Sequence, residues 1–243
     1  HQRLADGLLP EDVDAITGPP MGHPKSASFR TADLVGLDTF MHVAKNCYDN
    51  LSDDEERDVF QPPDWIEELV ANGAVGRKAG AGFYKKAGDD VLVYDYEKRD
   101  YREQKKVRFD SIGATKGKDD PGERVKAMIS GDDAAAKFAW TTLAHSLCYA
   151  ARRLGEITDD IVQVDRAMRW GFNWDLGPFE VWDAIGVKSS VERMKAEGFD
   201  VPAAVTDMLA SGRERFYDGP LSKLTYFDVF EKTAKLVPVD EQL

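Results

Sequence analysis

The sequence has few of the residues on which most metal and redox sites depend. It holds 2 cysteines and 4 histidines in 243 residues, and it contains no CxxC motif, no HExxH motif and no P-loop. Cys47 and Cys148 do not make a disulfide framework, and they fit a reducing compartment, which we predict to be the cytoplasm. Because no apolar run approaches the roughly 20 residues that cross a bilayer, we expect no membrane segment.

Positive charge is also scarce. The 32 lysines and arginines are outnumbered by 44 aspartates and glutamates, for a formal net charge of -12. This balance excludes a broad nucleic-acid-binding surface, because it offers nothing to offset phosphate repulsion. Hydrophobic residues make up 42% of the chain and aromatic residues 10%, which favours a folded core over disorder.

A dinucleotide fingerprint is missing as well. Gly80-Ala81-Gly82 lacks the third glycine at the required spacing and precedes a predicted strand instead of following one. We therefore expect neither cofactor-binding residues nor a metal site in this chain.

The sequence does contain an internal repeat. Three blocks recur in the same order, and the offset changes only between blocks. Asp12 and Ile16 pair with Asp160 and Val164 at 148 residues; Phe29, Asp33 and Gly36 pair with Phe179, Asp183 and Gly186 at 150; Phe83, Tyr84 and Asp95 pair with Phe216, Tyr217 and Asp228 at 133. We infer two diverged copies of one mostly helical module.

The repeat predicts the domain organisation. Residues 1–112 form copy one, residues 113–122, rich in glycine, form a linker, and residues 123–243 form copy two. A long amphipathic helix with Trp140, Leu147 and Leu154 on its apolar face precedes Gly155. Copy one has no room for its counterpart, so we expect that copy to lack most of its first helix and the protein to continue upstream.

Local signals predict the remaining elements. Helices are expected around 13–16, from Asp38, over 65–71, after an N-cap at Thr158, and over 203–211. Residues 91–96 alternate as a strand does, 101–107 return beside them as a hairpin, and 224–230 repeat this pattern weakly. The large aromatic residues of copy two are expected to form its core: Trp140, Trp170, Trp174, Phe179 and Trp182.

Two loops are candidate ligand sites. The segment 18–29, which contains Lys25 and Ser26, either lines a ligand cleft or is a helix connection stiffened by its prolines. The basic cluster 76–86 contains Arg77 and Lys78, and it either meets a phosphate or forms a tight turn that inserts aromatic residues into the core.

Other reactive side chains favour structural roles. His145 and Cys148 lie three residues apart, yet no third orienting group accompanies them, so a packed helix face is favoured over a nucleophile with its base. The acidic run 52–58 is typical of a solvated helix start with a capping box.

Three motifs carry a family resemblance. G-R-K-A-G-A-G-F-Y at 76–84, F-R-T-A-D-L-V-G-L-D at 29–38 and L-G-P-F-E-V-W-D-A-I-G at 176–186 resemble the C-terminal domain of 3-hydroxyacyl-CoA dehydrogenases. The tandem arrangement is similar to bacterial fusion enzymes of fatty-acid β-oxidation, which join a Rossmann domain, two such helical domains and an enoyl-CoA hydratase domain.

The resemblance implies a fold and an activity. The fold is mainly α, with two tandem helical domains similar to the C-terminal domain of 6-phosphogluconate dehydrogenase, each followed by a short β-hairpin. In single-domain relatives this domain forms the dimer interface, so the two copies would form a pseudo-dimer. The activity is oxidation of 3-hydroxyacyl-CoA to 3-ketoacyl-CoA with NAD, for which the family's catalytic His–Glu pair lies on the Rossmann domain.

No catalytic residue carries over to this chain, which we therefore expect to be inactive alone. Lys25, Ser26 and Phe29 match the family's loop near the acyl chain, although Ala27-Ser28-Phe29 replaces the family's G-P-F. A missing Rossmann domain, an acyl-CoA substrate, a downstream hydratase domain and a second copy of the chain are the expected partners. Two alternatives are open: a non-catalytic dimerisation or acyl-CoA-binding module, and an enzyme with a local site at His145 and Cys148.

Overall fold

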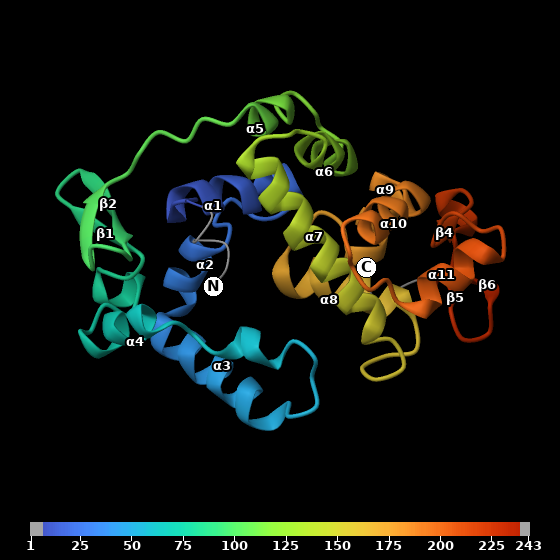
Figure 1. Ribbon diagram of the computed structural model, residues 1–243, viewed down its shortest axis with the longest axis horizontal. Helices are drawn as coiled ribbons and strands as arrows, with labels where there is room; N and C mark the ends of the chain where they lie inside the picture. Colours follow the sequence, from blue (N-terminus) through green and yellow to red (C-terminus); the bar gives the residue numbers. More distant parts are fainter. Residues whose placement is uncertain (1–6, 239–243) are drawn as a thin grey trace. The chain divides into compact units, whose positions relative to one another are not determined.

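The computed structural model describes residues 7–238 and divides them into two compact units (Figure 1). Unit 1 contains the described residues up to 19 together with 25–109, and unit 2 contains 20–24 together with the described residues from 110 onward. No helix within residues 7–238 has the length and apolar character needed to cross a membrane.

Unit 1 consists of short helices followed by a small antiparallel sheet. The helices are α1 (Pro10–Thr17), α2 (Phe29–Val35), α3 (Leu37–Asn50) and α4 (Asp64–Ala71), and the strands are β1 (Tyr84–Ala87), β2 (Asp90–Asp95) and β3 (Asp100–Glu103). Two short 3-10 helices, η2 (Arg57–Phe60) and η3 (Arg77–Ala79), lie in the connections. Pro10 opens α1, where its missing N–H costs nothing, and Pro63 stands directly before α4.

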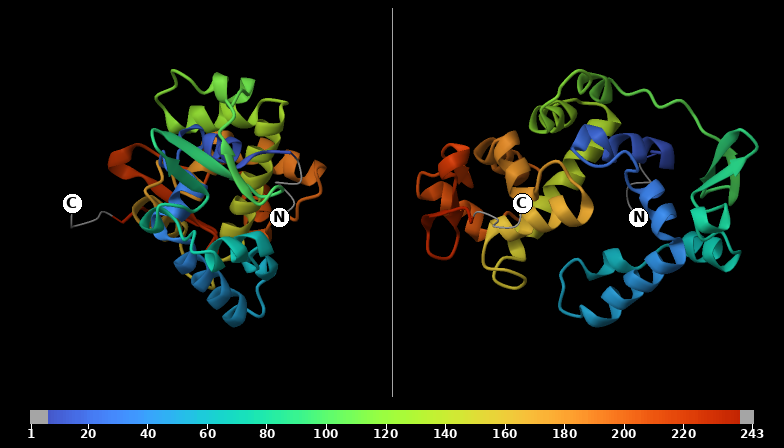
Figure 2. Two further views of the ribbon diagram at one scale, coloured as in Figure 1. Left: turned by 90° about the vertical axis from the view of Figure 1, so that its left-hand side faces the viewer. Right: turned by 180° about the vertical axis from the view of Figure 1, so that it is seen from behind.

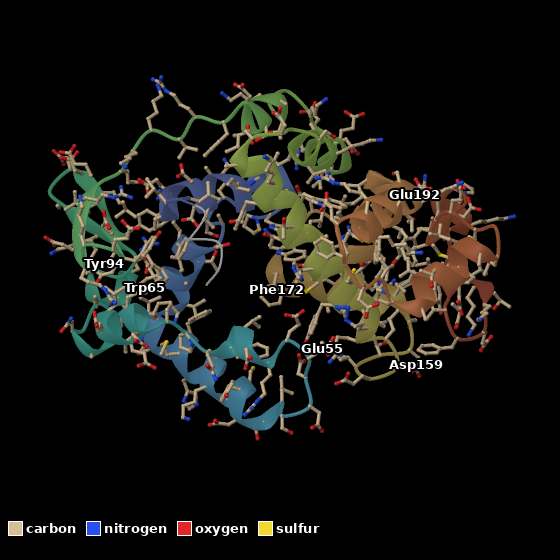
Figure 3. All side chains as sticks on the ribbon, in the orientation of Figure 1. Glu55, Trp65, Tyr94, Asp159, Phe172 and Glu192 are labelled. Atoms are coloured by element: carbon tan, nitrogen blue, oxygen red, sulfur yellow. The ribbon has the colours of Figure 1, made fainter. Side chains whose placement is uncertain are left out.

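The core of unit 1 joins α4 to the sheet. Trp65 and Leu69 of α4 pack with Phe83 and Tyr94 in one buried cluster. The rings of Trp65 and Tyr94 are stacked with centroids 6.2 Å apart, and both are labelled in Figure 3. Strand order β1-β2-β3 is held by antiparallel pairs such as Tyr84 with Val93. This packing fixes the start of β1 against α4.

Unit 2 also consists of helices followed by a small antiparallel sheet, but more helices precede its sheet than precede that of unit 1. Its helices are α5 (Asp110–Ala114), α6 (Pro121–Ile129), α7 (Ala134–Arg152), α8 (Ile161–Phe172), α9 (Pro178–Ile185), α10 (Val187–Ala196) and α11 (Ala203–Ala210). Its strands are β4 (Tyr217–Asp218), β5 (Thr225–Asp228) and β6 (Thr233–Leu236), and the 3-10 helix η4 (Leu221–Lys223) links β4 to β5. Asp120, Asp133 and Asp160 cap α6, α7 and α8 through their side chains.

The core of unit 2 surrounds α7, α9 and the sheet. Phe179 and Trp182 of α9 contact Phe216, with ring centroids 4.9 and 5.6 Å away. Cys148 of α7 faces Met194 of α10 at 3.9 Å between sulfur atoms. The views in Figure 2 show β4, β5 and β6 beside α11, where Lys232 and Asp207 form an ion pair at 3.0 Å.

The prediction of a mainly helical fold with short antiparallel strands is confirmed. Each predicted hairpin is, however, part of a three-stranded sheet, because the residues after Phe83 and Phe216 form a further strand that pairs with β2 or β5. The predicted N-cap at Thr158 is wrong. Asp160 caps α8 by accepting a hydrogen bond from the Gln163 amide at 2.9 Å.

The prediction that Trp170 is a core residue is also wrong. Its side chain is 60% exposed, because it lies nine residues after buried Ile161 and therefore on the opposite side of α8. The Arg166 guanidinium lies over its ring at 5.4 Å. Trp174 is half-buried, whereas Trp140, Phe179 and Trp182 are buried as predicted.

The predicted linker 113–122 contains the end of α5 and the start of α6, while residues 104–109 have no regular structure. The domain boundaries at 112 and 123 stay a prediction. The expected remnant of a first helix at 1–6 lies outside the described residues.

Candidate functional site

The strongest polar cluster of unit 1 is built on Asp14 of α1. Its buried carboxylate accepts hydrogen bonds from the amides of Ser28, Phe29 and Arg30 at 3.1, 2.7 and 3.2 Å. The hydroxyl of Tyr84 donates to the same carboxylate at 2.8 Å. Asp14 therefore holds the entry to α2, the end of the 18–29 loop, in one position.

Asp33 of α2 makes a second junction. Its carboxylate accepts from the amides of Phe83 and Tyr84, both at 2.8 Å. Gly82 has no room for a side chain, because a Cβ there would overlap Asp33 Oδ1 and lie 2.6 Å from Gly76 Cα. The two aspartates thus tie α1, α2 and the first strand together.

Unit 2 repeats the first junction at Asp165 of α8. This carboxylate accepts from the amides of Phe179 and Glu180 at 2.8 and 3.2 Å and from the Tyr217 hydroxyl at 2.7 Å. A Cβ at Gly177 would overlap Asp165. Here too the aspartate holds the amino end of a helix, α9, against the start of the sheet.

The second junction also recurs. Asp183 of α9 accepts from the amides of Phe216 and Tyr217 at 2.7 and 2.8 Å. In the turn after the middle strand, Asp95 Oδ1 accepts from the amides two and three residues ahead, and Asp228 Oδ1 does the same. The pairing of Asp33 with Asp183 and of Asp95 with Asp228 keeps the predicted offsets of 150 and 133 residues.

The first block of the repeat needs a correction. The shared hydrogen bonds pair Asp14 with Asp165, 151 residues apart, and not Asp12 with Asp160 at 148. Asp12 accepts from the Leu9 amide at 2.9 Å, and Asp160 caps α8. Both are local helix-start contacts, and acidic residues at helix starts recur in any sequence, which explains the false match.

Burial sets the protonation of these aspartates. It raises the pKa of Asp165 to about 8 and that of Asp183 to about 6, against the lowering effect of their hydrogen-bond donors. The charge of Glu180 adds to the rise in the pKa of Asp165. Burial also raises the pKa of Asp14, but Arg30, 3.7 Å away, opposes it.

The three predicted cleft residues lie on one turn before and at the start of α2. Lys25 is exposed, and Ser26 Oγ accepts a hydrogen bond from Thr31 Oγ1 at 2.8 Å. Phe29 is half-buried, with its ring edge-on to Phe83 at 4.7 Å. Ser26 and Phe29 are therefore held by unit 1, while Lys25 extends into solvent.

The preceding segment, 20–24, belongs to unit 2. The Asp175 amide donates to Gly22 O at 2.8 Å, and the His23 ring stacks on Trp174 at 4.1 Å between centroids. Arg124 forms an ion pair with Asp175 at 2.5 Å. The proline-rich loop therefore leaves unit 1 after Pro19 and returns to it at Lys25.

The other candidates have structural surroundings. His145 packs on Phe199 at 5.0 Å, and burial raises the pKa of the Cys148 thiol, which keeps it protonated and unreactive. Lys78 of the basic cluster donates to Asp38 at 2.7 Å. Among the described residues no group of three or more His, Cys, Asp or Glu has the arrangement of a metal site.

The glycines at 80–82 lead into β1 and not into a helix. A dinucleotide cradle needs a helix amino end facing the diphosphate, so this loop does not fit NAD. No chemical step is assigned to a cofactor on this chain.

Comparison with known proteins agrees with this geometry. Residues 1–86 match the family described as 3-hydroxyacyl-CoA dehydrogenase, C-terminal domain. The match covers α1 to α4 and the start of the first sheet, and hence both aspartate junctions of unit 1.

Longer relatives extend the similarity beyond residue 86. A "Probable 3-hydroxyacyl-CoA dehydrogenase" of Bacillus subtilis is 44% identical over 228 residues, which cover 94% of this chain and 29% of that protein. A "Putative fatty acid oxidation complex trifunctional enzyme" of Rickettsia prowazekii is 23% identical over 192 residues, 74% of this chain and 24% of that protein. The chain thus spans less than a third of either relative.

The sequence predicted the repeat but not the hydrogen bonds that its residues make. Asp33 and Asp183 were paired only as matching residues, and no role was predicted for Asp14, Tyr84 or Asp165. The signal was present, since a polar residue kept at the same place in two otherwise apolar blocks points to a buried hydrogen-bond network.

Proposed function

We propose that this chain is the substrate-cleft and scaffold portion of an NAD-dependent 3-hydroxyacyl-CoA dehydrogenase that oxidises 3-hydroxyacyl-CoA to 3-ketoacyl-CoA in fatty-acid β-oxidation. The family match of residues 1–86 carries the proposal. The names of the Bacillus subtilis and Rickettsia prowazekii relatives support the reaction and the pathway respectively.

The turn before α2 is the part that we assign to the acyl-CoA cleft. Asp14 fixes the amides of Ser28, Phe29 and Arg30, so this turn is rigid on one side and exposed at Lys25 on the other. A rigid, partly apolar edge with one cation suits a substrate that joins an acyl chain to a phosphorylated carrier. Lys25, Ser26 and Phe29 are the proposed contacts.

Unit 2 is the proposed scaffold, a second copy of the same domain. It has the same junctions as unit 1, yet α6 and α7 cover its helical face. Ile185 is 6% exposed and Ser190 5%, whereas Val35 and Phe40 at the matching positions of unit 1 are 55% and 44% exposed. We assign binding to the copy with the open face and support to the copy with the covered one.

The catalytic His–Glu pair and NAD are proposed to lie in a cofactor domain outside this chain. A chimera in which this chain replaces the 228 aligned residues of the Bacillus subtilis relative tests the assignment. With acetoacetyl-CoA, the chimera should oxidise NADH and the isolated chain should not. A folded but inactive chimera would refute the assignment, and activity of the isolated chain would place catalysis within residues 1–243.

A second candidate function is a non-catalytic dimerisation module. The open face of unit 1 favours it: Leu34, Val35, Phe40 and Val43 are 53%, 55%, 44% and 54% exposed on α2 and α3, and clustered exposed apolar residues are typical of an interface. A sedimentation-velocity comparison of the chain with Phe40→Glu decides the point. A dimer that the substitution dissociates would favour this function, and a monomer throughout would exclude it.

A further inference from the structure

The connection from the last helix to the sheet differs in length between the two units. It runs over residues 72–83 in unit 1 but only over 211–216 in unit 2. Both connections end on the same hydrogen bonds, from Phe83 to Asp33 and from Phe216 to Asp183. In unit 1, Gly76 and Gly82 pack directly against Asp33, and the longer connection fills the space beside the junction.

The shorter connection of unit 2 leaves a hollow of about 480 Å³. Six residues line it: Ser211, Gly212, Arg213, Glu214, Arg215 and Asp218. Counting back from the shared Phe-Tyr pair, Arg213 and Arg215 stand where unit 1 has Gly80 and Gly82. Two glycines of one copy are thus replaced by two arginines at the lip of a hollow in the other.

The side chain of Arg213 is held in place and still has a donor without an acceptor. Its Nε donates to Arg215 O at 2.9 Å, and its guanidinium carbon lies 5.4 Å from the centre of the Phe227 ring. Within the part of the chain that the structure describes, Nη2 of Arg213 is buried and has no hydrogen-bond partner. Buried guanidinium N–H groups are nearly always hydrogen-bonded, so we expect a bound ligand to supply the acceptor for Nη2 of Arg213.

Arg215 presents the second guanidinium from the rim. Its side chain is 64% exposed, and among the described residues its side-chain polar contacts run through Nε, to Tyr217 O at 3.3 Å and to Asp183 at 4.0 Å. The two Nη groups of Arg215 are therefore available to a ligand.

The acidic residues of the lining are already engaged. Glu214 forms an ion pair with Lys188 at 3.1 Å, and Asp218 Oδ1 accepts a hydrogen bond from the Gly219 amide at 2.8 Å. The two carboxylates lower the local positive charge, but within residues 7–238 neither forms an ion pair with Arg213 or Arg215.

We propose that this hollow of unit 2 binds the phosphoryl group of a phosphate ester or diphosphate, held by the guanidinium groups of Arg213 and Arg215. A guanidinium presents its N–H donors in a planar arrangement that matches phosphate oxygens, and two such groups in one lining can bind the same anion. The site is separate from the cleft assigned to unit 1, and it stands whether or not the dehydrogenase function is correct.

Calorimetric titration of the full chain at low ionic strength tests the site, with inorganic phosphate and adenosine 3′,5′-bisphosphate as separate probes. Arg215→Gln should weaken binding about ten-fold or more, since it removes charge-assisted hydrogen bonds. Arg213→Lys keeps the charge but removes the planar guanidinium, and it should also weaken binding. Arg108→Gln, at an exposed position of unit 1, makes the same change of charge and should leave the affinity unaltered.

The two probes distinguish the sources of the anion. Equal affinity for both would identify a site for free phosphate, and tighter binding of the bisphosphate would identify a site for a nucleotide-bearing ligand; either supports the proposal. Absence of binding by both, or an equal loss in Arg108→Gln and Arg215→Gln, would overturn it. Circular dichroism melts of each variant confirm that the fold is intact.

Discussion

Each unit contains the same type of hydrogen-bond network around a buried aspartate, but the charged residue beside that aspartate differs between the units. Asp14 and Asp165 accept from the same kinds of donor, a helix-start backbone and a tyrosine hydroxyl. Burial raises the pKa of both carboxylates; Arg30 opposes the rise at Asp14, whereas Glu180 adds to it at Asp165. The two units therefore share the geometry of the network, and burial together with one charged neighbour sets the protonation of each aspartate.

A second contrast concerns exposure. Unit 2 buries the face of α9 and α10 beneath its own helices, and Trp140 of α7 donates to Glu197 beyond the end of α10 at 2.5 Å. Unit 1 leaves the matching face of α2 and α3 open. The two units thus share their internal junctions and differ in their outer surfaces, which is consistent with the proposal that unit 1 binds substrate and unit 2 supports it.

Removal of a junction aspartate should have the largest effect. Asp165→Ala leaves two backbone amides and the Tyr217 hydroxyl without an acceptor, and Asp14→Ala leaves three backbone amides and the Tyr84 hydroxyl without one. We expect each substitution to lower the free energy of unfolding by about 3 kcal/mol or more. Urea unfolding followed by far-ultraviolet circular dichroism measures it. If only one of the two substitutions lowered the free energy of unfolding, Asp14 and Asp165 would not have equivalent roles.

The glycine that contacts Asp33 should come next. Gly82→Ala places a Cβ on Asp33 Oδ1, and we expect a loss of about 2 kcal/mol from the forced shift. Arg215→Ala, at the matching position of unit 2, should change stability by less than about 0.5 kcal/mol because that side chain is exposed. Thermal melts of both variants provide the test, and equal effects would contradict the assigned correspondence.

The tyrosine hydroxyls should contribute less. Tyr217→Phe and Tyr84→Phe each remove one donor to a carboxylate, and we expect a loss of about 1 to 2 kcal/mol in each case. Because Asp165 is the more deeply buried aspartate, Tyr217→Phe should cost more. Guanidinium unfolding curves for the two variants rank them, and the reverse order would show that burial of the carboxylate does not decide the cost.

The contribution of Glu180 to the pH dependence of unit 2 should be the smallest effect. The folded-state pKa of Asp165, about 8, exceeds the unfolded value of about 4. Its contribution is therefore fully present below about pH 4 and is lost as the pH rises through 8. Glu180→Gln removes a neighbour that raises this pKa and keeps an acceptor for the Gly177 amide, so stability should fall less between pH 5 and pH 8.

Urea midpoints at intervals of pH measure this slope. Glu192→Gln on α10, labelled in Figure 3, makes the same change of charge at an exposed position and serves as the control. If Glu180→Gln and Glu192→Gln alter the slope equally, the neighbour at Asp165 is not responsible.

Sequence patterns predicted the helices that carry strong local signals. The helices predicted around 13–16, over 65–71 and over 203–211 are present as α1, α4 and α11, and each has a proline at its first residue or its N-cap, which is a local effect. The repeat also placed Phe83 and Phe216 in equivalent positions. One failure depended on side-chain direction: Trp170 was predicted to be a core residue because it is large, although helix geometry turns it to solvent.

The site itself was harder to predict. Asp14 lies close to Asp12 in the sequence, and only the acceptor role of its carboxylate shows which of the two belongs to the network. The exchange of residues 20–24 into unit 2 has no local sequence signal, because it depends on contacts such as His23 with Trp174 that are distant in the chain.

The division of labour between the two units is the central claim, and steady-state kinetics on the chimera with the Bacillus subtilis relative test it most directly. Asp14→Asn loosens the turn that carries Lys25, Ser26 and Phe29, and it should lower kcat/KM for acetoacetyl-CoA by about ten-fold or more. Asp165→Asn, the matched change in unit 2, should leave kcat/KM within about two-fold at a temperature where both variants stay folded. Equal losses, or a larger loss from Asp165→Asn, would contradict the assignment of the cleft to unit 1.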